Sequence, residues 1–360
     1  MKKRADPTCA FVVRCRLLAI LGWMLSVGAV PVSVLDLAPV ATGSTVGEAL
    51  RNSVDLAQHV EQLGYLRHWV AEHHNMPGIA SSAPAVLIAH LASVTTTLRV
   101  GSGGVMLPNH QPLVIAEQFG MLEALHPGRI DLGIGRAPGT DQITAYALRR
   151  TLDTSADDLP TRLAELLAFF EGTFPQITAV PGNGQKPAIW LLGSSDFSAR
   201  LAGELGLPFS FAHHFMPQNT IPALDLYRRS FRPSAALQEP YAMVGVAVVC
   251  AEDDEQARWL HGPAGLSFLR LRTGRPSTLP SPEEAAAYPF TPAEHAFVEN
   301  WTATHIVGSP DTVRESLHAL QTDTAANELM LTTMVHDHAD RLRSYELIAK
   351  ALAAPLTRDP

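Results

Sequence analysis

The chain has 360 residues, of which 46% are hydrophobic and 17% are charged, so it is long enough to bury a large core. Its formal net charge is −8 and its basic residues are dispersed, which argues against a nucleic-acid-binding protein. The three cysteines, Cys9, Cys15 and Cys250, show neither a CxxC pair nor the spacing of a disulfide scaffold.

The first 30 residues differ in composition from the rest of the chain. Basic residues at 2–4, 14 and 16 precede LLAILGWMLSVGAV, a run of 14 uncharged residues that is short for a membrane span. Small residues at 27 and 29 stand where a signal peptidase would cleave. Residues 1–30 are therefore either a signal-like segment or an N-terminal extension from a start codon assigned upstream of Met24, and neither predicts stable insertion into a membrane.

From residue 32 onward, near-continuous apolar runs alternate with segments of helical periodicity. Such runs are typical of parallel strands that are buried on both faces. The predicted strands span 32–40, 66–74, 98–108, 129–135, 188–193, 207–215, 241–250 and 327–335. The predicted helices span about 46–63, 82–96, 112–125, 157–171, 194–205, 310–320 and 338–354.

Local signals mark the ends of several of these helices. Thr45 and Glu48 form a capping box, Gly64 and Gly206 are typical of helix C-termini, and Ser309 begins a later helix. Eight strands alternating with helices predict an α/β protein, a (β/α)8 TIM-like barrel with a polar, proline-rich insertion before the last strand. A doubly wound open sheet is the alternative.

In a barrel, chemistry is found at the carboxyl ends of the strands. Five polar or glycine-rich stretches would meet at that end: EHHN, SGGVMLPNH, GIGRAPG, GSSDFS and AHHF. Side chains from distant parts of the sequence are thereby predicted to share one rim.

The adjacent histidines His73 and His74 raise the question of a metal site. Consecutive strand residues point to opposite faces, so one ion cannot easily bind both side chains. The sequence has no HExxH motif and no Cys/His cluster, so we predict no metal, although a distant third ligand such as His213 stays open. His73 is predicted to act as a base or a hydrogen-bond donor. A buried structural histidine is the alternative, and it is the stronger reading for His74.

Two further stretches point to a bound anion. The run GSSDFS, from Gly193 to Ser198, is a strand end and helix start rich in hydroxyls, where free N–H groups and the helix dipole favour negative charge. Ordinary capping by one serine is the alternative. Arg136 follows Gly133 and Gly135 at another strand end, but Pro138 interrupts the glycines and disfavours a dinucleotide fingerprint.

Glycines inside the third predicted strand are unusual, because glycine weakens strands. Gly103 and Gly104 suggest close approach of a ligand to the backbone, or an unusual peptide bond. Met106 and Leu107 could form an apolar wall beside it or belong to the core.

These stretches together resemble the bacterial luciferase-like monooxygenases, the flavin-dependent family that includes alkanal monooxygenase. The resemblance runs from about residue 32 to 352, within a barrel domain of residues 31–355. It rests on WVAEHHNMPG, LRVGSGGVMLPNHQPLVIAEQ, HPGRIDLGIGRAPG, WLLGSSDFSARLAGELGLPF and HIVGSPDTVRESL. Residues 251–300 match poorly and are predicted to form a variable insertion.

The resemblance implies a barrel that binds FMN at the carboxyl ends of its strands. Reduced FMN would come from a separate flavin reductase, react with O₂ and oxidise a small organic substrate. By position, His73 matches the catalytic histidine, and Gly103 and Gly104 match a pair joined by a cis peptide bond under the isoalloxazine, where the family often has bulkier residues. The resemblance assigns the flavin phosphate to Arg136, Gly193, Ser194, Ser195 and Ser198, and we expect Met106 and His213 to contact substrate.

Other functions remain open at this point. An F420-dependent dehydrogenase of the same superfamily, a flavin-binding protein without turnover and a secreted binding protein would each suit parts of the sequence. Reduced FMN is made in the cytosol, so we favour a cytoplasmic protein, with export as the minority alternative. A homodimer is possible.

Overall fold

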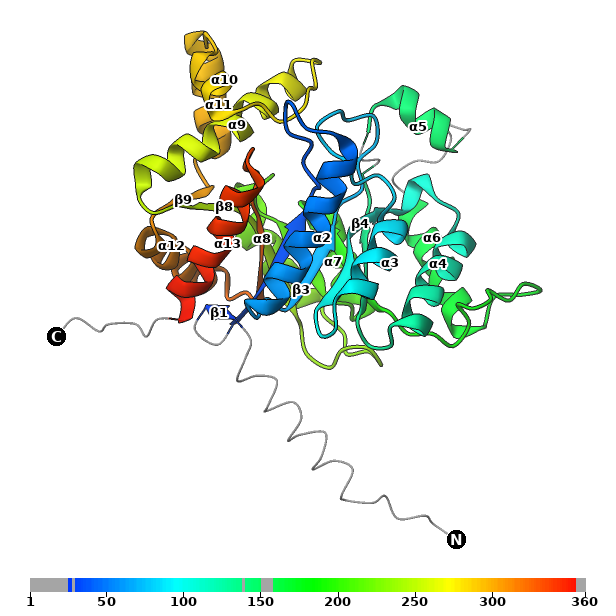
Figure 1. Ribbon diagram of the computed structural model, residues 1–360. Coiled ribbons are helices and arrows are strands. Elements are labelled where there is room, and N and C mark those ends of the chain that lie inside the picture. Colours follow the sequence, from blue (N-terminus) through cyan, green and yellow to red (C-terminus); the bar gives the residue numbers. More distant parts are fainter. Residues whose placement is uncertain (1–24, 28–29, 138–139, 150–157, 354–360) are drawn as a thin grey trace, which may run out of the picture.

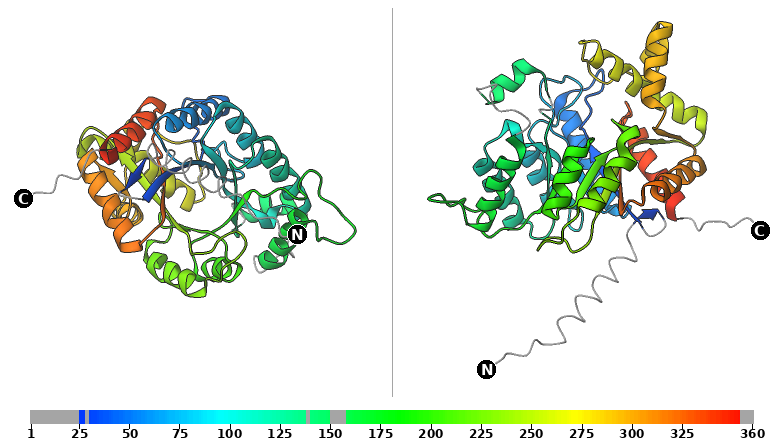
Figure 2. Two further views of the ribbon diagram at one scale, coloured as in Figure 1. Left: turned by 90° about the horizontal axis from the view of Figure 1, so that it is seen from below. Right: turned by 180° about the vertical axis from the view of Figure 1, so that it is seen from behind.

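A computed structural model describes residues 25–27, 30–137, 140–149 and 158–353 (Figures 1 and 2). Eight parallel strands form a closed barrel, because each strand pairs with the next along the chain and the last pairs with the first. They are β2 (Val30–Asp36), β3 (Arg67–Val70), β4 (Arg99–Met106), β5 (Ile130–Gly135), β6 (Ala188–Gly193), β7 (Phe209–Ala212), β8 (Ala242–Cys250) and β10 (Glu328–Thr332). The predicted TIM-like fold is confirmed, and the open sheet is wrong.

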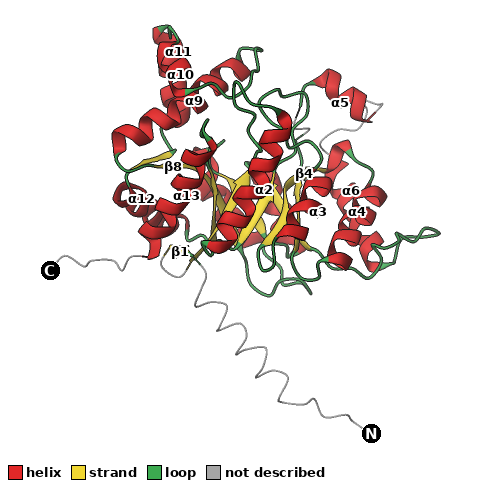
Figure 3. Ribbon diagram, in the orientation of Figure 1, coloured by secondary structure: helices red, strands yellow, loops and turns green. Residues whose placement is uncertain are grey.

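Helices surround the barrel and bury their apolar faces against it (Figure 3). They are α2 (Val46–Gln62), α3 (Pro84–Val94), α4 (Pro112–Leu125), α6 (Leu159–Glu171), α7 (Asp196–Leu205), α8 (Thr220–Ser230), α12 (Pro310–Thr324) and α13 (His338–Ala353). The predicted capping box at Thr45 and Glu48 is present, and Gly206 ends α7 in the left-handed conformation. These local signals therefore predicted several helix ends correctly.

Five of the predicted strands end earlier than expected, and the histidine pairs follow two of them. β3 ends at Val70 instead of residue 74, and β7 ends at Ala212 instead of residue 215. Beyond these ends the backbone bonds to loops: the N–H of His73 donates to Ser81 O, and that of His213 to Phe211 O. Both histidine pairs therefore lie on loops at the rim, where the alternation of side chains along a strand no longer applies.

The segment between β8 and β10 contains more regular structure than its composition suggested. It includes α9 (Asp254–Arg272), α10 (Pro282–Ala287), α11 (Pro292–Thr302) and the short strand β9 (Ile306–Gly308), which pairs with β8. Pro263 lies inside α9. Because proline usually interrupts a helix, the sequence alone did not predict this one. In Figure 1, α9 to α11 and α5 (Gln142–Arg149) lie at the end of the molecule opposite β1 (Ser26–Val27).

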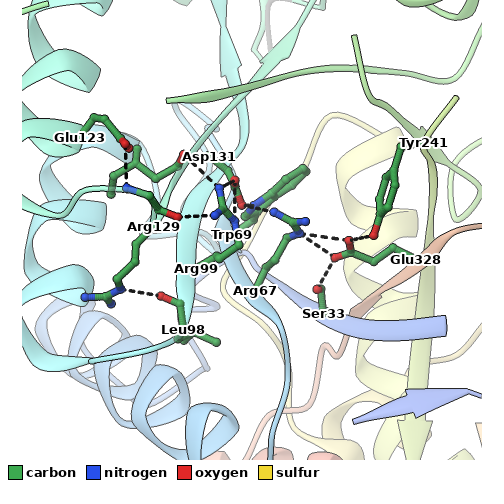
Figure 4. A network of polar contacts seen from close by, with 12 residues as sticks. Ser33, Arg67, Trp69, Leu98, Arg99, Glu123, Arg129, Asp131, Tyr241 and Glu328 are labelled. Atoms are coloured by element: carbon green, nitrogen blue, oxygen red, sulfur yellow. Dashed lines mark hydrogen bonds and ion pairs between the residues drawn. The ribbon is translucent and has the colours of Figure 1, made fainter. Parts of the chain in front are cut away.

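A network of buried charges closes the amino-terminal end of the barrel (Figure 4). Arg67, the first residue of β3, lies 2.8 Å from Asp131 Oδ2 and 2.9 Å from Glu328 Oε1. Trp69 also donates to Asp131, and Tyr241 donates to Glu328 over 2.9 Å each. Burial alone would raise the pKa of Asp131, but the neighbouring arginines hold it below its usual range. Each charge in this network has a partner.

The chain contributes to the core before the predicted boundary at residue 31. β1 pairs antiparallel with β2, and the side chains of Leu25 and Val27 are buried. Residues 1–24 and 28–29 lie outside the described part of the chain. Of the predicted signal-like segment, the structure therefore describes only residues 25–27 and Val30, the first residue of β2. In the described ranges, no helix combines the length and apolar character that crossing a bilayer requires.

Candidate active site

A cavity of about 430 Å³ opens at the carboxyl end of the barrel, a size typical of small-molecule sites. Its walls come from the ends of the barrel strands and from α9, α11 and the residues that follow α11. Among the described residues that line it, Arg136 is the single formally charged side chain, and no carboxylate faces the cavity. The site is thus apolar for most of its surface, with a few polar groups at defined places.

His73 lines this cavity from the loop that follows β3. Its backbone is fixed by the bond to Ser81, and its Nδ1 is buried without a partner in the described parts of the chain. Burial lowers the pKa of His73 to about 4, and the carboxylate of Glu72 only partly opposes this shift. The imidazole is therefore neutral at pH 7 and able to accept or pass on a proton.

His74 does not line the cavity, and a carboxylate holds it elsewhere. Its Nε2 lies 2.9 Å from Glu72 Oε1, which also lies 2.8 Å from Nε2 of His110. The other oxygen of Glu72 accepts a hydrogen bond from the N–H of Met106 over 3.0 Å. Burial would raise the pKa of Glu72, but its contacts with His110 and His74 hold it below its usual range. Glu72 thus ties the loop that carries His73 to the end of β4.

Sequence reasoning did not single out Glu72 or His110. Glu72 was visible in the EHHN stretch, but its partners lie 34 and 38 residues further along the chain. A buried carboxylate next to a candidate base is a signal that could have drawn attention to it.

Gly103 and Gly104 both line the cavity, and the peptide bond between them is cis, as the resemblance implied. A Cβ on Gly103 would lie 2.6 Å from Leu35 Cδ1, and one on Gly104 would lie 2.7 Å from Gly133 O. The packing of the barrel therefore excludes side chains at both positions, and this holds whether or not a ligand lies against them in the cavity. Met106 lines the same wall.

The stretch that the sequence predicts to bind an anion lines one side of the cavity. Ser195 is the N-cap residue of α7, yet its hydroxyl makes no capping hydrogen bond, so ordinary capping does not explain it. A Cβ on Gly193 would lie 2.6 Å from Ser198 Oγ, which keeps this position a glycine. The residues that share this part of the cavity are Arg136, Gly193, Ser194, Ser195 and Ser198.

The guanidinium of Arg136 completes this arrangement. It stacks over the ring of Phe197, with its Cζ 4.8 Å from the ring centroid, and none of the described carboxylates forms an ion pair with it. Pro138 and Gly139 lie outside the described residues. A helix start with free N–H groups, three hydroxyls and one unpaired cation can hold a phosphate.

The prediction for His213 is corrected by the structure. His213 does not line the cavity, because the chain turns after β7 and brings Nδ1 of His213 to 2.8 Å from the hydroxyl of Thr220 in α8. The adjacent His214 lines the cavity instead. Sequence reasoning missed His214, and it also missed the wall supplied by the insertion, which includes His261, Phe268, Trp301 and His305.

No metal site is apparent within residues 25–27, 30–137, 140–149 and 158–353. No group of three or more His, Cys, Asp or Glu side chains in these ranges could hold an ion. Cys250, at the end of β8, is a free cysteine buried in the core.

Comparison with known proteins agrees with this geometry. A family model described as luciferase-like monooxygenase matches residues 30–327. The chain is 54% identical over 320 residues to the uncharacterized protein YvbT of Bacillus subtilis, covering 88% of this chain and 95% of that protein. It is 49% identical over 317 residues to a luciferase-like monooxygenase of Escherichia coli, with the same coverage of both chains.

Solved structures show the same relationship. The crystal structure of apo-MsnO8 matches with a TM-score of 0.83 and 42% identity, covering 89% of this chain and 98% of that one. At 22% identity and a TM-score of 0.69, the oxygenating constituent of 3,6-diketocamphane monooxygenase from Pseudomonas putida, in complex with FMN, shares the fold. An F420-dependent secondary alcohol dehydrogenase shares it at 12% identity and a TM-score of 0.67.

Proposed function

Because the chain belongs to the luciferase-like monooxygenase family, we propose that it is an FMN-dependent monooxygenase that uses reduced FMN and O₂ to oxidise a small organic substrate. One observation carries this proposal: a phosphate-binding arrangement and a neutral, buried histidine line the same cavity. FMN, when bound and reduced, would supply the electrons and the reaction with O₂. The residues of the chain would bind, orient and protect the reacting groups.

The phosphate of FMN would lie at the start of α7. Arg136 would neutralise its charge, while the hydroxyls of Ser194, Ser195 and Ser198 and the first N–H groups of the helix would donate hydrogen bonds. From there the flavin ring would extend towards Gly103, Gly104 and His73 on β4 and the end of β3.

His73 would be the catalytic acid–base group. Its imidazole is neutral at pH 7 and therefore has a lone pair that can accept a proton from substrate or water, and burial, which disfavours the charged form, favours the return of that proton. Leu35, Trp69 and Met106 line the same cavity and provide apolar surface that limits access of water. Met106 would also contact the substrate.

The proposal includes partners and a location. We propose a two-component enzyme that receives reduced FMN from a separate flavin reductase in the cytoplasm. We also propose a homodimer formed through α4, because Val114, Met121 and Leu125 recur along this helix and are 43%, 53% and 66% exposed.

The identity of the cofactor is tested by loading and releasing it. Purified full-length protein should bind FMN, and the absorption spectrum and mass of the released cofactor should be those of FMN, whereas F420 would identify a dehydrogenase. With a flavin reductase, NADH and O₂, turnover should appear that the protein alone lacks. Bound FMN without any turnover would favour a non-catalytic flavin-binding protein.

The position of the phosphate is tested by substitution. Arg136→Ala should weaken FMN binding by about 1.5–3 kcal/mol, the usual range for a hydrogen bond to a charged group. Ser195→Ala should have a smaller effect in the same direction. Arg200→Ala is the matched control, because this arginine lies on α7, close to the proposed phosphate site, but is exposed and does not line the cavity. Unchanged FMN affinity in both site variants would place the phosphate elsewhere.

A further inference from the structure

The residues assigned to FMN occupy one half of the rim. They follow β3, β4, β5 and β6, which are neighbours around the barrel. The other half, formed by the ends of β7 and β8 and by the insertion, lines the same cavity and has no role in holding the flavin. The inference below concerns this half and rests on the proposed function.

His214 is the polar group of this half whose orientation is best defined. Its N–H and its ring Nδ1 lie 3.1 and 2.9 Å from the same acceptor, the carbonyl oxygen of Gly245 on β8. Since a carbonyl only accepts, Nδ1 must carry the hydrogen, and this fixes the tautomer. The ring packs against Phe215 at 4.3 Å between centroids. A Cβ on Gly245 would lie 3.3 Å from two atoms of the imidazole, so the glycine makes room for it.

The fixed tautomer leaves Nε2 of His214 as a bare acceptor. Burial lowers the pKa of His214 to about 4, so the ring is neutral at pH 7. None of the described residues donates a hydrogen bond to Nε2, and the side chain lines the cavity. A neutral imidazole held in this way accepts a hydrogen bond from a ligand O–H or N–H group.

The insertion builds the facing wall from aromatic rings. Phe268 of α9 stacks on Trp301 of α11 with 4.0 Å between centroids and 9° between planes, and both line the cavity. His261 and His305 pair with each other over 2.9 Å between ring nitrogens. Burial lowers the pKa of His261 to about 4 and that of His305 to about 3, so this wall carries no charge at pH 7.

The charge of the wall decides which ligands fit. Among the described residues, none that lines the cavity on this side carries a charge at pH 7, and Arg136 is assigned to the phosphate. An anion or cation would lose its hydration without finding a counter-charge, which disfavours its binding strongly. Flat apolar molecules, in contrast, gain from contact with aromatic rings.

We propose that this half of the cavity binds an uncharged, flat and mostly apolar substrate, and that an O–H or N–H group of the substrate donates to Nε2 of His214. His214 is then a specificity-determining residue, because a substrate that lacks the donor leaves a buried acceptor without a partner. The proposal covers hydroxylated or N–H-bearing aromatic compounds and excludes their carboxylates.

The test compares three probes of one ring system that differ in a single group: 2-naphthol, 2-methoxynaphthalene and 2-naphthoate. Their dissociation constants are measured by titration calorimetry on full-length protein, with and without FMN. We expect 2-naphthol to bind about tenfold more tightly than the methyl ether, as one hydrogen bond to a buried acceptor implies, and 2-naphthoate to bind most weakly.

Adjacent histidines provide a matched pair of variants. His214→Asn keeps an amide N–H for the carbonyl of Gly245 but places no acceptor where Nε2 was, so the preference for 2-naphthol should fall from about tenfold to about one. His213→Asn should keep the full preference, because His213 bonds to Thr220 and does not line the cavity. Thermal midpoints of both variants show that each is folded.

Three results would overturn the assignment. They are equal affinity of the wild type for 2-naphthol and its methyl ether, tightest binding of 2-naphthoate, and equal loss of preference in both variants. A separate FMN titration keeps the two proposals apart. Failure of the wild type to bind FMN would overturn the proposed function, while the probe affinities of the protein without FMN would still decide the role of His214.

Discussion

The two ends of the barrel treat buried polar groups in opposite ways. At the amino-terminal end, Arg67 is bonded to both Asp131 and Glu328, and every charge of the network has a partner (Figure 4). At the carboxyl end, Nδ1 of His73 and Nε2 of His305 are buried without partners among the described residues. Arg67 and the two carboxylates that it bonds thus satisfy one another, while imidazole nitrogens at the cavity stay without partners.

This difference separates stability from function. A buried group without a partner costs free energy, so an accumulation of such groups marks a place where something else is expected to bind. When every polar group of a network already has a partner, none is left to bind a ligand. Such a network stabilises the folded state instead. Substitutions at the two ends should therefore produce different kinds of defect.

The largest effect is expected from His73→Ala, which should lower the rate of substrate oxidation by about 10²–10⁴-fold. FMN binding and stability should change little, because the imidazole holds no hydrogen bond to other described side chains. Stopped-flow absorbance after mixing reduced enzyme with O₂, together with peroxide yield, measures the loss. His74→Ala is the control and should lower stability instead, since His74 is bonded to Glu72. A reversal of these two phenotypes would mean that the roles of the histidines are exchanged.

At the opposite end, Arg67→Met should destabilise the protein by about 3–5 kcal/mol, because it leaves Asp131 and Glu328 buried without their shared cation. Any folded protein should retain its affinity for FMN. Arg343→Met is a suitable control, since Arg343 forms ion pairs with Glu252 and Glu346 at the surface, where solvent screens them and they contribute little to stability. Urea unfolding measures both, and similar losses in the two variants would contradict the role given to the buried network.

A third prediction concerns β1, which also lies at the amino-terminal end. A chain that begins at Met24 retains Leu25 and Val27, whereas one that begins at Pro31 exposes the surface they cover. Fully burying one such side chain stabilises a protein by about 1.5–3 kcal/mol, so the shorter chain should be less stable by at least that amount. Equal unfolding free energies would show that β1 is dispensable, as expected if residues 1–30 were removed as a signal peptide.

The sequence predicts the barrel well because its signals are local. Apolar runs, the capping box at Thr45 and the glycine at 206 each depend on a few adjacent residues, and they agree with one another. The charge network could not be predicted in this way. Arg67 lies 64 residues from Asp131 and 261 from Glu328, so their meeting depends on closure of the whole barrel.

The carboxyl end was predicted in part, and its errors have a common cause. His73, Arg136 and the serines after β6 follow strands directly, so the rule that chemistry follows barrel strands found them. The choice of His213 over His214 failed because the chain leaves β7 at Ala212, and side-chain direction in a turn does not follow strand alternation. The wall built by α9 and α11 was missed because helices inside an irregular insertion were not expected.

The smallest expected effect is a dependence of stability on pH to which the histidines of the cavity contribute and the charge network does not. His73 and His214 each have a pKa of about 4 in the folded protein, below the value of about 6.5 for an exposed histidine. Since the unfolded chain binds more protons between these values, the stabilisation is complete above pH 6.5 and declines as the pH falls towards 4. The pKa of Asp131 is lowered as well, but a carboxylate loses its contribution only below about pH 4.

Between pH 7.5 and pH 6, each of these histidines should therefore reduce the unfolding free energy by on the order of 1 kcal/mol, while the charge network contributes nothing. Urea unfolding of His214→Asn at both pH values should show a smaller decrease than the wild type. Tyr241→Phe, which removes a hydrogen bond to Glu328, should lower stability by the same amount at both pH values. If His214→Asn shows the same decrease in unfolding free energy as the wild type, His214 titrates like an exposed side chain. It would then not be the buried, neutral acceptor that the proposed substrate site requires.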